Sequence, residues 1–169
     1  MTDPNLSVTL IQTELSWHDP AANCARFEKL IQPLAGQTDL IVLPEMFTTG
    51  FTMATTEVAE PVNGPSVEWL RKMAARVNAA ITGSVVTKDG DQYFNRLIWM
   101  RPDGSFESYD KRHLFRMARE HEHYAAGQQR LVVQIGAWKI CPQVCYDLRF
   151  PVWSRNRLGT PEGYDLLIY

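Results

Sequence analysis

The sequence predicts an α/β fold with mixed β-sheets and helices packed outside them. Early in the chain, apolar β-branched segments alternate with segments whose apolar residues recur at helical spacing, which is typical of βα units. Later segments are short, apolar and joined by tight turns such as Asp89-Gly90, which is typical of antiparallel hairpins. Because the 169 residues contain no repeat, low-complexity tract or linker, we expect one domain spanning residues 1–169.

The composition is that of an ordinary soluble globular protein. Hydrophobic residues make up 45% of the chain and charged residues 21%, and the net charge of −2 favours neither nucleic acid nor an anionic membrane as a partner. No apolar run approaches the length of a transmembrane helix, and residues 1–6 lack the pattern of a signal peptide. Three cysteines provide no disulfide framework, so we expect a reducing, cytoplasmic environment. No metal is expected, because Cys141 and Cys145 lack a matching Cys or His pair.

The first two predicted strands flank the first predicted helix. Residues 7–13 are apolar and β-branched, and residues 39–43 are almost wholly apolar, which predicts a second strand covered on both faces. Asp19 and Pro20 supply an N-cap and a first helical residue between these strands, and Gly36 ends the helix. The apolar residues at helical spacing are Cys24, Phe27, Leu30, Ile31 and Leu34.

A loop, a second helix and three strands are predicted next. Residues 48–63 form an irregular loop of the kind that often lines a binding site. Pro65 then begins a helix. Its apolar face consists of Val67, Leu70, Ala74 and Val77. The three strands are expected at residues 80–86, 93–100 and 105–109.

The following segment combines a loop, a hairpin and a short helix. Residues 116–127 are polar without a clear period, so we expect a loop with one helical turn. Gly136-Ala137 joins two strands into a hairpin, and these strands are expected at residues 131–135 and 138–144. The second of them is expected to continue to Cys145. After a sharp change of direction, residues 151–158 form a helix that begins with a proline.

Three ionisable residues, Glu45, Lys111 and Cys145, follow predicted strands directly. If those strands lie side by side, the three side chains can converge on one rim. A thiol nucleophile requires a base, which a carboxylate provides. A lysine ammonium and the Tyr146 N–H can stabilise an oxyanion. Taken alone, however, each residue also has an ordinary interpretation as a core cysteine or a solvated charge.

The segments around these residues resemble the signature blocks of a known family. They are Leu-Pro-Glu-Met-Phe around Glu45, Tyr-Asp-Lys-Arg-His-Leu-Phe around Lys111 and Val-Cys-Tyr-Asp-Leu-Arg-Phe-Pro around Cys145. In content and order they are similar to the three blocks of the carbon–nitrogen hydrolase (nitrilase) superfamily, and most similar to its bacterial ω-amidases. The resemblance implies a four-layer α-β-β-α sandwich with two mixed β-sheets, usually a homodimer. It also implies a Glu–Lys–Cys triad of Glu45, Lys111 and Cys145.

The resemblance implies further site residues. A second glutamate follows the lysine block in the family, and Glu120 matches that position better than Glu122. The aromatic candidates for a small acyl pocket are Phe47, Phe51 and Tyr146. Packing in the core is an equally good interpretation for these three.

The turn after Cys145 carries two charges, Asp147 and Arg149. We expect them to form an ion pair that braces the turn, and the alternative is that Arg149 binds the substrate. His113 and His123 are expected to have structural roles, because no acidic or cysteine cluster accompanies them as a metal site would require.

The activity implied by the resemblance is hydrolysis of a small ω-amide to a carboxylate and ammonia through a Cys145 thioester. The expected substrate is the monoamide of a 2-oxo dicarboxylic acid, such as 2-oxoglutaramate, and no cofactor is needed. Two alternatives stay open: a nitrilase or N-carbamoyl amidohydrolase of the same superfamily, or a non-catalytic binding protein with an inert Cys145. A cysteine protease is disfavoured, because no histidine stands in an evident partner block.

The family domain continues beyond the segment that matches residues 164–169. A Trp-Pro loop, a helix and further strands normally follow, so the chain is expected to lack the C-terminal part of the domain. Residues 164–169 are largely apolar, without the Lys, Pro or bulge that protects a sheet edge, so we expect an interior strand with a neighbour on each side. A product of 169 residues alone is therefore expected to associate or to be poorly soluble.

Overall fold

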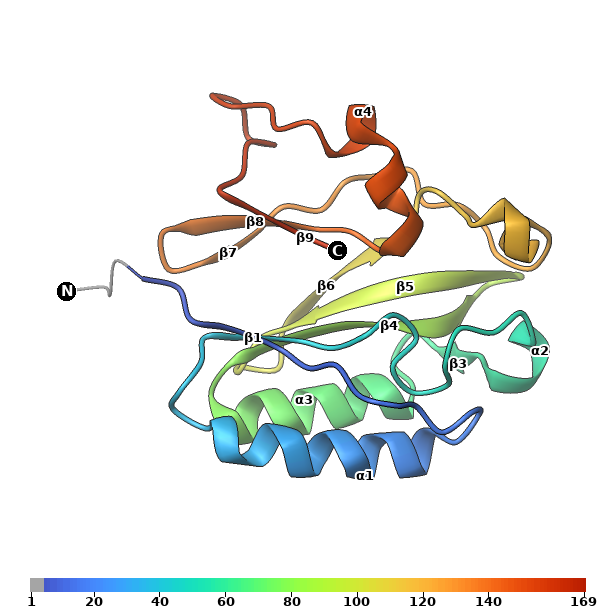
Figure 1. The fold of residues 1–169 in the computed structure, drawn as a ribbon, viewed down its shortest axis with the longest axis horizontal. Helices are drawn as coiled ribbons and strands as arrows, with labels where there is room; N and C mark the ends of the chain where they lie inside the picture. Colours follow the sequence, from blue (N-terminus) through green and yellow to red (C-terminus); the bar gives the residue numbers. More distant parts are fainter. Residues whose placement is uncertain (1–4) are drawn as a thin grey trace.

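Two β-sheets face each other in the computed structural model, which describes residues 5–169. Figure 1 shows four layers, in which α1 and α3 cover the larger sheet, the smaller sheet lies on its other face, and α4 lies beyond the smaller sheet. The helices are α1 (Pro20–Ile31), α3 (Pro65–Val77) and α4 (Pro151–Ser154). The expected α-β-β-α arrangement with two mixed sheets is confirmed.

The larger sheet has the strand order β1-β2-β4-β5-β6, and β3 also pairs with β4. The strands are β1 (Val8–Leu10), β2 (Leu40–Val42), β3 (Glu60–Pro61), β4 (Ala80–Asp89), β5 (Gln92–Met100) and β6 (Phe106–Asp110). Strands β1, β2 and β4 are parallel, as the two βα units require, whereas β4, β5 and β6 are antiparallel. Consequently β2, β4 and β6 all run in the same direction and end at the same edge of the sheet.

The smaller sheet consists of β7 (Val133–Ile135), β8 (Trp138–Pro142) and β9 (Leu166–Ile168). Ile135 pairs with Trp138 across Gly136-Ala137, which confirms the two-residue hairpin, and Gly136 has a φ of +55°. Strand β9 pairs in parallel with β8, its neighbour within residues 5–169. The expected second neighbour of β9 stays a prediction.

The apolar residues of β2 explain its burial on both faces. Leu40 packs between the two sheets with Trp99 and Ile140, whereas the next residue, Ile41, packs against the helices. Both side chains are fully buried. Successive side chains of a strand point to opposite faces, so a strand in the middle of a sandwich needs apolar residues throughout.

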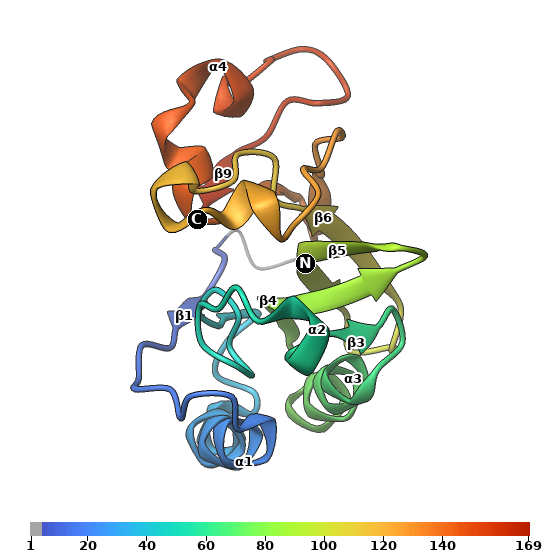
Figure 2. The ribbon, with the colours of Figure 1, turned by 90° about the vertical axis from the view of Figure 1, so that its right-hand side faces the viewer.

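The two long helices differ in how well their apolar faces were predicted. In Figure 2 they lie side by side beneath the larger sheet. The predicted face of α3 is confirmed, since Val67, Leu70, Ala74 and Val77 are all buried. In α1, Phe27 and Ile31 are fully buried, but Leu30 is 42% exposed and the buried position one turn before Phe27 belongs to Asn23. The face of α1 is therefore narrower than the pattern of apolar residues suggests.

Several predicted loops and helices differ from those in the structure, because short helical turns and strands have no periodic sequence pattern. The loop at residues 48–63 contains a helical turn, α2 (Thr55–Val58), and strand β3. Residues 116–127 contain two 3₁₀ turns, η2 (Arg116–Ala118) and η3 (Glu120–Glu122), where one turn was expected. Helix α4 ends at Ser154 instead of residue 158. A further 3₁₀ turn, η1 (Gln32–Leu34), extends α1 before Gly36.

Candidate active site

Cys145 is the first residue of a 3₁₀ helix, η4 (Cys145–Arg149), that follows β8. The predicted strand is therefore shorter than expected, since it ends at Pro142 instead of continuing to Cys145. Cys145 has a φ of +43°, a conformation that is uncommon for residues other than glycine. This sharp change of direction leaves Cys145 exposed, whereas Val144 beside it is buried. Tyr146 is the second residue of η4, where an N–H has no partner within its own helix.

The carboxylate of Asp147 holds this turn in place. Its Oδ2 accepts hydrogen bonds from the Val144 N–H at 3.1 Å and from Tyr109 Oη at 2.7 Å. Its Oδ1 lies 2.8 Å from both the backbone N and the ring Nδ1 of His113. Asp147 is completely buried, whereas Arg149 lies on the surface. The predicted Asp147–Arg149 ion pair is therefore wrong, because the buried carboxylate is occupied by donors from Val144 after β8, from β6 and from the segment after β6.

His113 has the structural contacts that were expected for it. Besides its bonds to Asp147, its ring stacks on Phe150 with a centroid distance of 3.7 Å. His123 is exposed on the surface.

Lys111 lies between two glutamates. Its Nζ donates to Glu45 Oε1 at 2.8 Å and to Glu120 Oε2 and Oε1 at 2.9 and 3.1 Å. The side chains of Lys111 and Glu120 are completely buried, and that of Glu45 is 19% exposed. Glu45 follows β2 and Lys111 follows β6, and these strands end at the same edge of the larger sheet. The strand directions thus explain how residues so distant in sequence meet.

Asn95, in the middle of β5, completes this cluster. Its Nδ2 donates to Glu45 Oε1 at 2.8 Å and to Glu120 Oε1 at 3.2 Å. Its backbone carbonyl accepts the N–H of Lys111 at 3.0 Å. Glu120 accepts a further hydrogen bond from the backbone N–H of Phe115 at 2.6 Å. These donors compensate the burial of two carboxylates.

The charges of the cluster act on both Lys111 and Cys145. Burial alone would lower the pKa of Lys111, but the charges and hydrogen bonds of Glu45 and Glu120 outweigh it and the pKa is raised. Lys111 is therefore an ammonium at neutral pH. Burial and then the negative charge of Glu45 raise the pKa of Cys145 to about 11, against an opposing effect of Lys111. The resting side chain of Cys145 is consequently a thiol beside a carboxylate.

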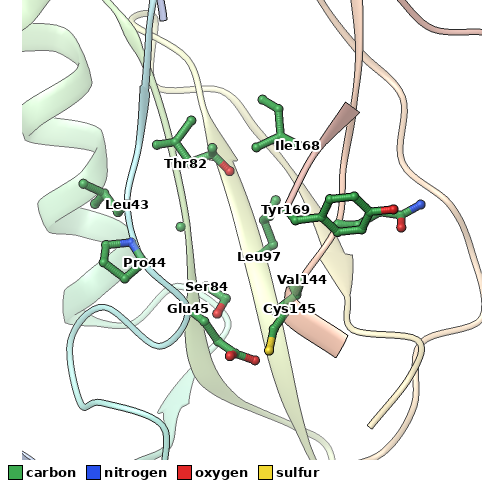
Figure 3. Close-up of a pocket in the computed structure, with 13 residues that line it drawn as sticks. Leu43, Pro44, Glu45, Thr82, Ser84, Leu97, Val144, Cys145, Ile168 and Tyr169 are labelled. Atoms are coloured by element: carbon green, nitrogen blue, oxygen red, sulfur yellow. The ribbon is translucent and has the colours of Figure 1, made fainter. Parts of the chain in front are cut away.

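Glu45 and Cys145 line one cavity of about 180 Å³ between the two sheets. Figure 3 shows the Glu45 carboxylate and the Cys145 sulfur pointing toward each other at one end of it. The other lining residues are Val42, Leu43, Pro44, Thr82, Gly83, Ser84, Leu97, Gln143, Val144, Ile168 and Tyr169. A thiol, a neighbouring carboxylate and a nearby ammonium can together support nucleophilic attack on a carbonyl carbon.

The remaining predicted site residues lie outside the lining of this cavity. Phe47 is completely buried in the core beneath the larger sheet, where its ring contacts Phe27 and Trp69. It therefore packs and does not line the cavity. Phe51 lies closer to the cluster, with its ring centroid 5.3 Å from Lys111 Nζ. The Tyr146 ring packs edge-on against Phe115 and Phe150, so its backbone N–H is the group that adjoins Cys145.

Sequence reasoning missed Asn95, although a signal was present. The predicted strand at residues 93–100 is apolar in its second half, and Asn95 is a polar residue that the structure buries to 1% exposure. A buried polar side chain is more informative than a buried apolar one. Its partners, however, are 50 and 25 residues away, and no local pattern identifies them.

The described part of the chain contains neither a membrane helix nor a metal cluster. Within residues 5–169, no helix has the length and apolar character needed to cross a bilayer. The same residues contain no group of three or more His, Cys, Asp or Glu side chains that could hold a metal ion.

Comparison with known proteins identifies the family of the chain. The sequence profile of the carbon-nitrogen hydrolase family matches residues 7–169. The chain belongs to the carbon–nitrogen hydrolase family. A solved carbon–nitrogen hydrolase superfamily protein of Xanthomonas campestris, which carries an arsenic adduct in its active site, is 49% identical with a TM-score of 0.91. The match covers 96% of this chain and 64% of that protein.

Two curated relatives of the chain carry names that describe an activity. Omega-amidase YafV of Yersinia enterocolitica is 51% identical over 164 residues, which are 97% of this chain and 62% of the relative. 2-Oxoglutaramate amidase of Bacillus subtilis is 29% identical over 164 residues, 95% of this chain and 62% of the relative. The chain therefore spans about three fifths of the length of each of these two relatives.

Proposed function

We propose that the protein that contains this chain is an ω-amidase, which hydrolyses the terminal amide of a small 2-oxo dicarboxylic acid to a carboxylate and ammonia. The observation that carries this proposal is the meeting of Glu45 and Cys145 at one cavity, with Lys111 buried between Glu45 and Glu120. The names of relatives at 51% and 29% identity support the substrate class.

The first step is attack of the Cys145 sulfur on the amide carbonyl carbon. Because burial and Glu45 keep the resting thiol protonated, its proton must leave as the bond forms. Glu45 accepts that proton, so the negative charge of the cluster passes to the carbonyl oxygen of the substrate. The Tyr146 N–H donates to this oxyanion. Lys111, whose N–H groups are directed at Glu45 and Glu120, stabilises it through its positive charge.

The following steps return the enzyme to its starting state. The protonated Glu45 gives its proton to the amide nitrogen, and the C–N bond breaks. Ammonia departs, and the acyl group remains bound to Cys145 as a thioester. Glu45 then takes a proton from water, which attacks the thioester carbon. The acid departs, and the thiolate recovers its proton from Glu45. Glu120 keeps Lys111 in place throughout and touches no reacting atom.

The dimensions of the cavity favour a small acyl group. Its volume of about 180 Å³ is smaller than the roughly 300–1,000 Å³ of sites for drug-sized ligands. Apart from the reactive pair Glu45 and Cys145, most of its lining is apolar, with Thr82, Ser84 and Gln143 as further polar residues. A short carbon chain with one amide end matches these features better than a peptide does.

Substrate profiling of the protein expressed from its complete reading frame tests the proposal. Ammonia release is measured with 2-oxoglutaramate, a short aliphatic nitrile and an N-carbamoyl amino acid, on wild type and on Cys145→Ala. We expect the amide to react fastest and the variant to be inactive. A preference for the nitrile or the N-carbamoyl compound would assign the protein to another branch of the family. Equal rates for wild type and variant would exclude Cys145 as nucleophile.

We further infer a cytoplasmic homodimer whose only ligand class is the small amide, with neither nucleic acid nor membrane as partner. The support is the three cysteines without a disulfide framework, the net charge of −2 and the family resemblance. Size-exclusion chromatography with light scattering tests the dimer, and a monomer at micromolar concentration would contradict it.

A further inference from the structure

Asn95 contacts all three charged residues of the cluster through different groups. Its side-chain amide donates to Glu45 and Glu120, and its backbone carbonyl holds the backbone of Lys111. It lies on β5, between the strands that deliver Glu45 and Lys111. Because the residue is 1% exposed, pairs with Val86 of β4 and accepts the Lys111 N–H on its other side, its position is fixed by the sheet.

The atoms that Asn95 contacts decide which oxygen of Glu45 can act as the base. Both Asn95 Nδ2 and Lys111 Nζ donate to Oε1 of Glu45, each at 2.8 Å. The second oxygen, Oε2, is thereby left for the thiol of Cys145. Two donors, one on β5 and one directly after β6, fix the plane of the carboxylate, which one donor alone cannot do.

The amide of Asn95 also has an orientation that packing alone does not explain. Within the described residues, its Oδ1 is buried without a hydrogen-bond partner. Rotating the amide by half a turn would place this oxygen against Glu45 and Glu120, both of which are acceptors, so the cluster fixes the orientation. A buried unpaired carbonyl is unfavourable. An apolar residue of the same size would avoid it, so the amide serves the two carboxylates and not the core.

We propose that Asn95 is a positioning residue, which holds the Glu45 carboxylate with Oε2 toward Cys145 and ties it to Glu120. The role in catalysis rests on the proposed amidase function, but the positioning itself does not. Loss of the Asn95 donor frees Glu45 to turn away from the sulfur. Asn95 does not touch the substrate, so its loss lowers kcat and leaves KM unchanged.

A measurement that needs no substrate tests the positioning. The rate of Cys145 alkylation by iodoacetamide is followed against pH in the protein from the complete reading frame, for wild type, Asn95→Leu and Glu45→Gln. Wild type is expected to have a midpoint near 11. Removing the charge of Glu45 lowers the midpoint, and Asn95→Leu is expected to lower it in the same direction. A midpoint equal to that of wild type in folded Asn95→Leu would overturn the proposal.

Turnover of the amide provides the second test. It separates the positioning role of Asn95 from the proposed amidase function. In Asn95→Leu, and in Asn95→Asp, which has the same shape but lacks the two N–H donors, kcat is expected to fall about 100-fold at unchanged KM. Retained kcat in either folded variant would overturn the positioning role. If wild type turns over no amide, the proposed function fails, and the alkylation profile alone decides the role of Asn95.

Asn23 offers a matched control elsewhere in the molecule. It is as deeply buried as Asn95, and its amide donates to the backbone carbonyls of Ser16 and Thr48. The same substitutions, Asn23→Leu and Asn23→Asp, are expected to lower the melting temperature without changing the alkylation midpoint or kcat of the folded protein. Equal changes at both positions would indicate a general loosening and would also overturn the proposal.

Discussion

The Nζ of Lys111 lies 2.8 Å from Oε1 of Glu45, although 66 residues separate the two in the sequence. The contact follows from strand direction, because β2 and β6 run the same way and end at the same edge of one sheet. Glu120 on the other side of Lys111 makes the ammonium the centre of a buried cluster with two carboxylates. The consequences for stability can be tested separately from those for catalysis.

Replacing Lys111 with Met should destabilise the protein by about 3–5 kcal/mol, because Glu45 and Glu120 lose their buried counter-charge. Urea unfolding of both proteins measures the difference. Arg119→Met is the control, since its ion pair with Glu122 is exposed, and it should change stability little. Equal effects of the two substitutions would show that the buried cluster contributes no more than a surface pair.

The contribution of Lys111 to stability should also depend on pH at the alkaline end. Its pKa in the folded state is raised above the ordinary value of 10.5, so the ammonium is favoured by folding. The stabilisation is therefore fully present below about pH 10.5 and is lost as the pH rises through the folded-state pKa. The difference in unfolding free energy between wild type and Lys111→Met should be constant from pH 7 to 10 and shrink above this range. A difference that grows with pH would contradict this sign.

Among the three cysteines, Cys145 should react first with an alkylating reagent. Cys141 is completely buried, and burial together with Glu60 and Glu28 raises the pKa of Cys24 to about 12. Mass spectrometry after brief alkylation identifies the modified peptide, and Cys24→Ser serves as the control that leaves the pattern unchanged. Cys145→Ser should be nearly inactive, because a hydroxyl is much harder to deprotonate than a thiol. Labelling of Cys24 before Cys145 would contradict the account.

The sequence predicted an α/β fold with outer helices because the long elements have clear periods, whereas the four-layer arrangement was implied by the family resemblance. The apolar face of α3 follows from burial on one side of the helix, and the wholly apolar sequence of β2 follows from burial on both faces of the strand. The charged residues Glu45 and Lys111 were found through their place after strands and through the signature blocks. The contacts of Asp147 were not predictable in the same way, because its partners on β6 and in the segment after β6 lie 34 to 38 residues away. A local pattern suggested Arg149 instead.

Substitutions around Asp147 test whether this carboxylate supports the nucleophile turn. Tyr109→Phe removes one donor to Asp147 and the acceptor of the Trp153 Nε1–H, and it should cost about 1–3 kcal/mol of stability. Because η4 then loosens, kcat should fall while the pH of half-maximal Cys145 alkylation changes little. Tyr164→Phe, at a partly buried tyrosine that bonds a backbone carbonyl away from Cys145, is the matched control and should retain kcat. Unchanged kcat in Tyr109→Phe would contradict a supporting role.

Gly127 should be essential for the position of Lys111. A Cβ added at Gly127 would lie 2.0 Å from the carbonyl oxygen of Asp110, and the Gly127 N–H donates to the carbonyl of Lys111. Gly127→Ala must therefore push the chain away from the end of β6, and both stability and turnover should fall. Gly136→Ala is the control. A Cβ added at Gly136 would have no other atom within 4 Å, but the φ of +55° there is strained for a residue with a side chain. Gly136→Ala should therefore lower the free energy of unfolding by roughly 1–2 kcal/mol and leave turnover normal. Normal turnover in Gly127→Ala would contradict this role.

In the proposed mechanism Cys145 forms a thioester with the substrate, and this thioester can be trapped. The protein from the complete reading frame is mixed with 2-oxoglutaramate, quenched in acid within the first turnovers and digested for mass spectrometry. We expect that the peptide containing Cys145 carries the mass of the acyl group, that ammonia has been released, and that Cys145→Ala shows neither. Ammonia release by Cys145→Ala at the wild-type rate, or an acyl group on another residue, would contradict it.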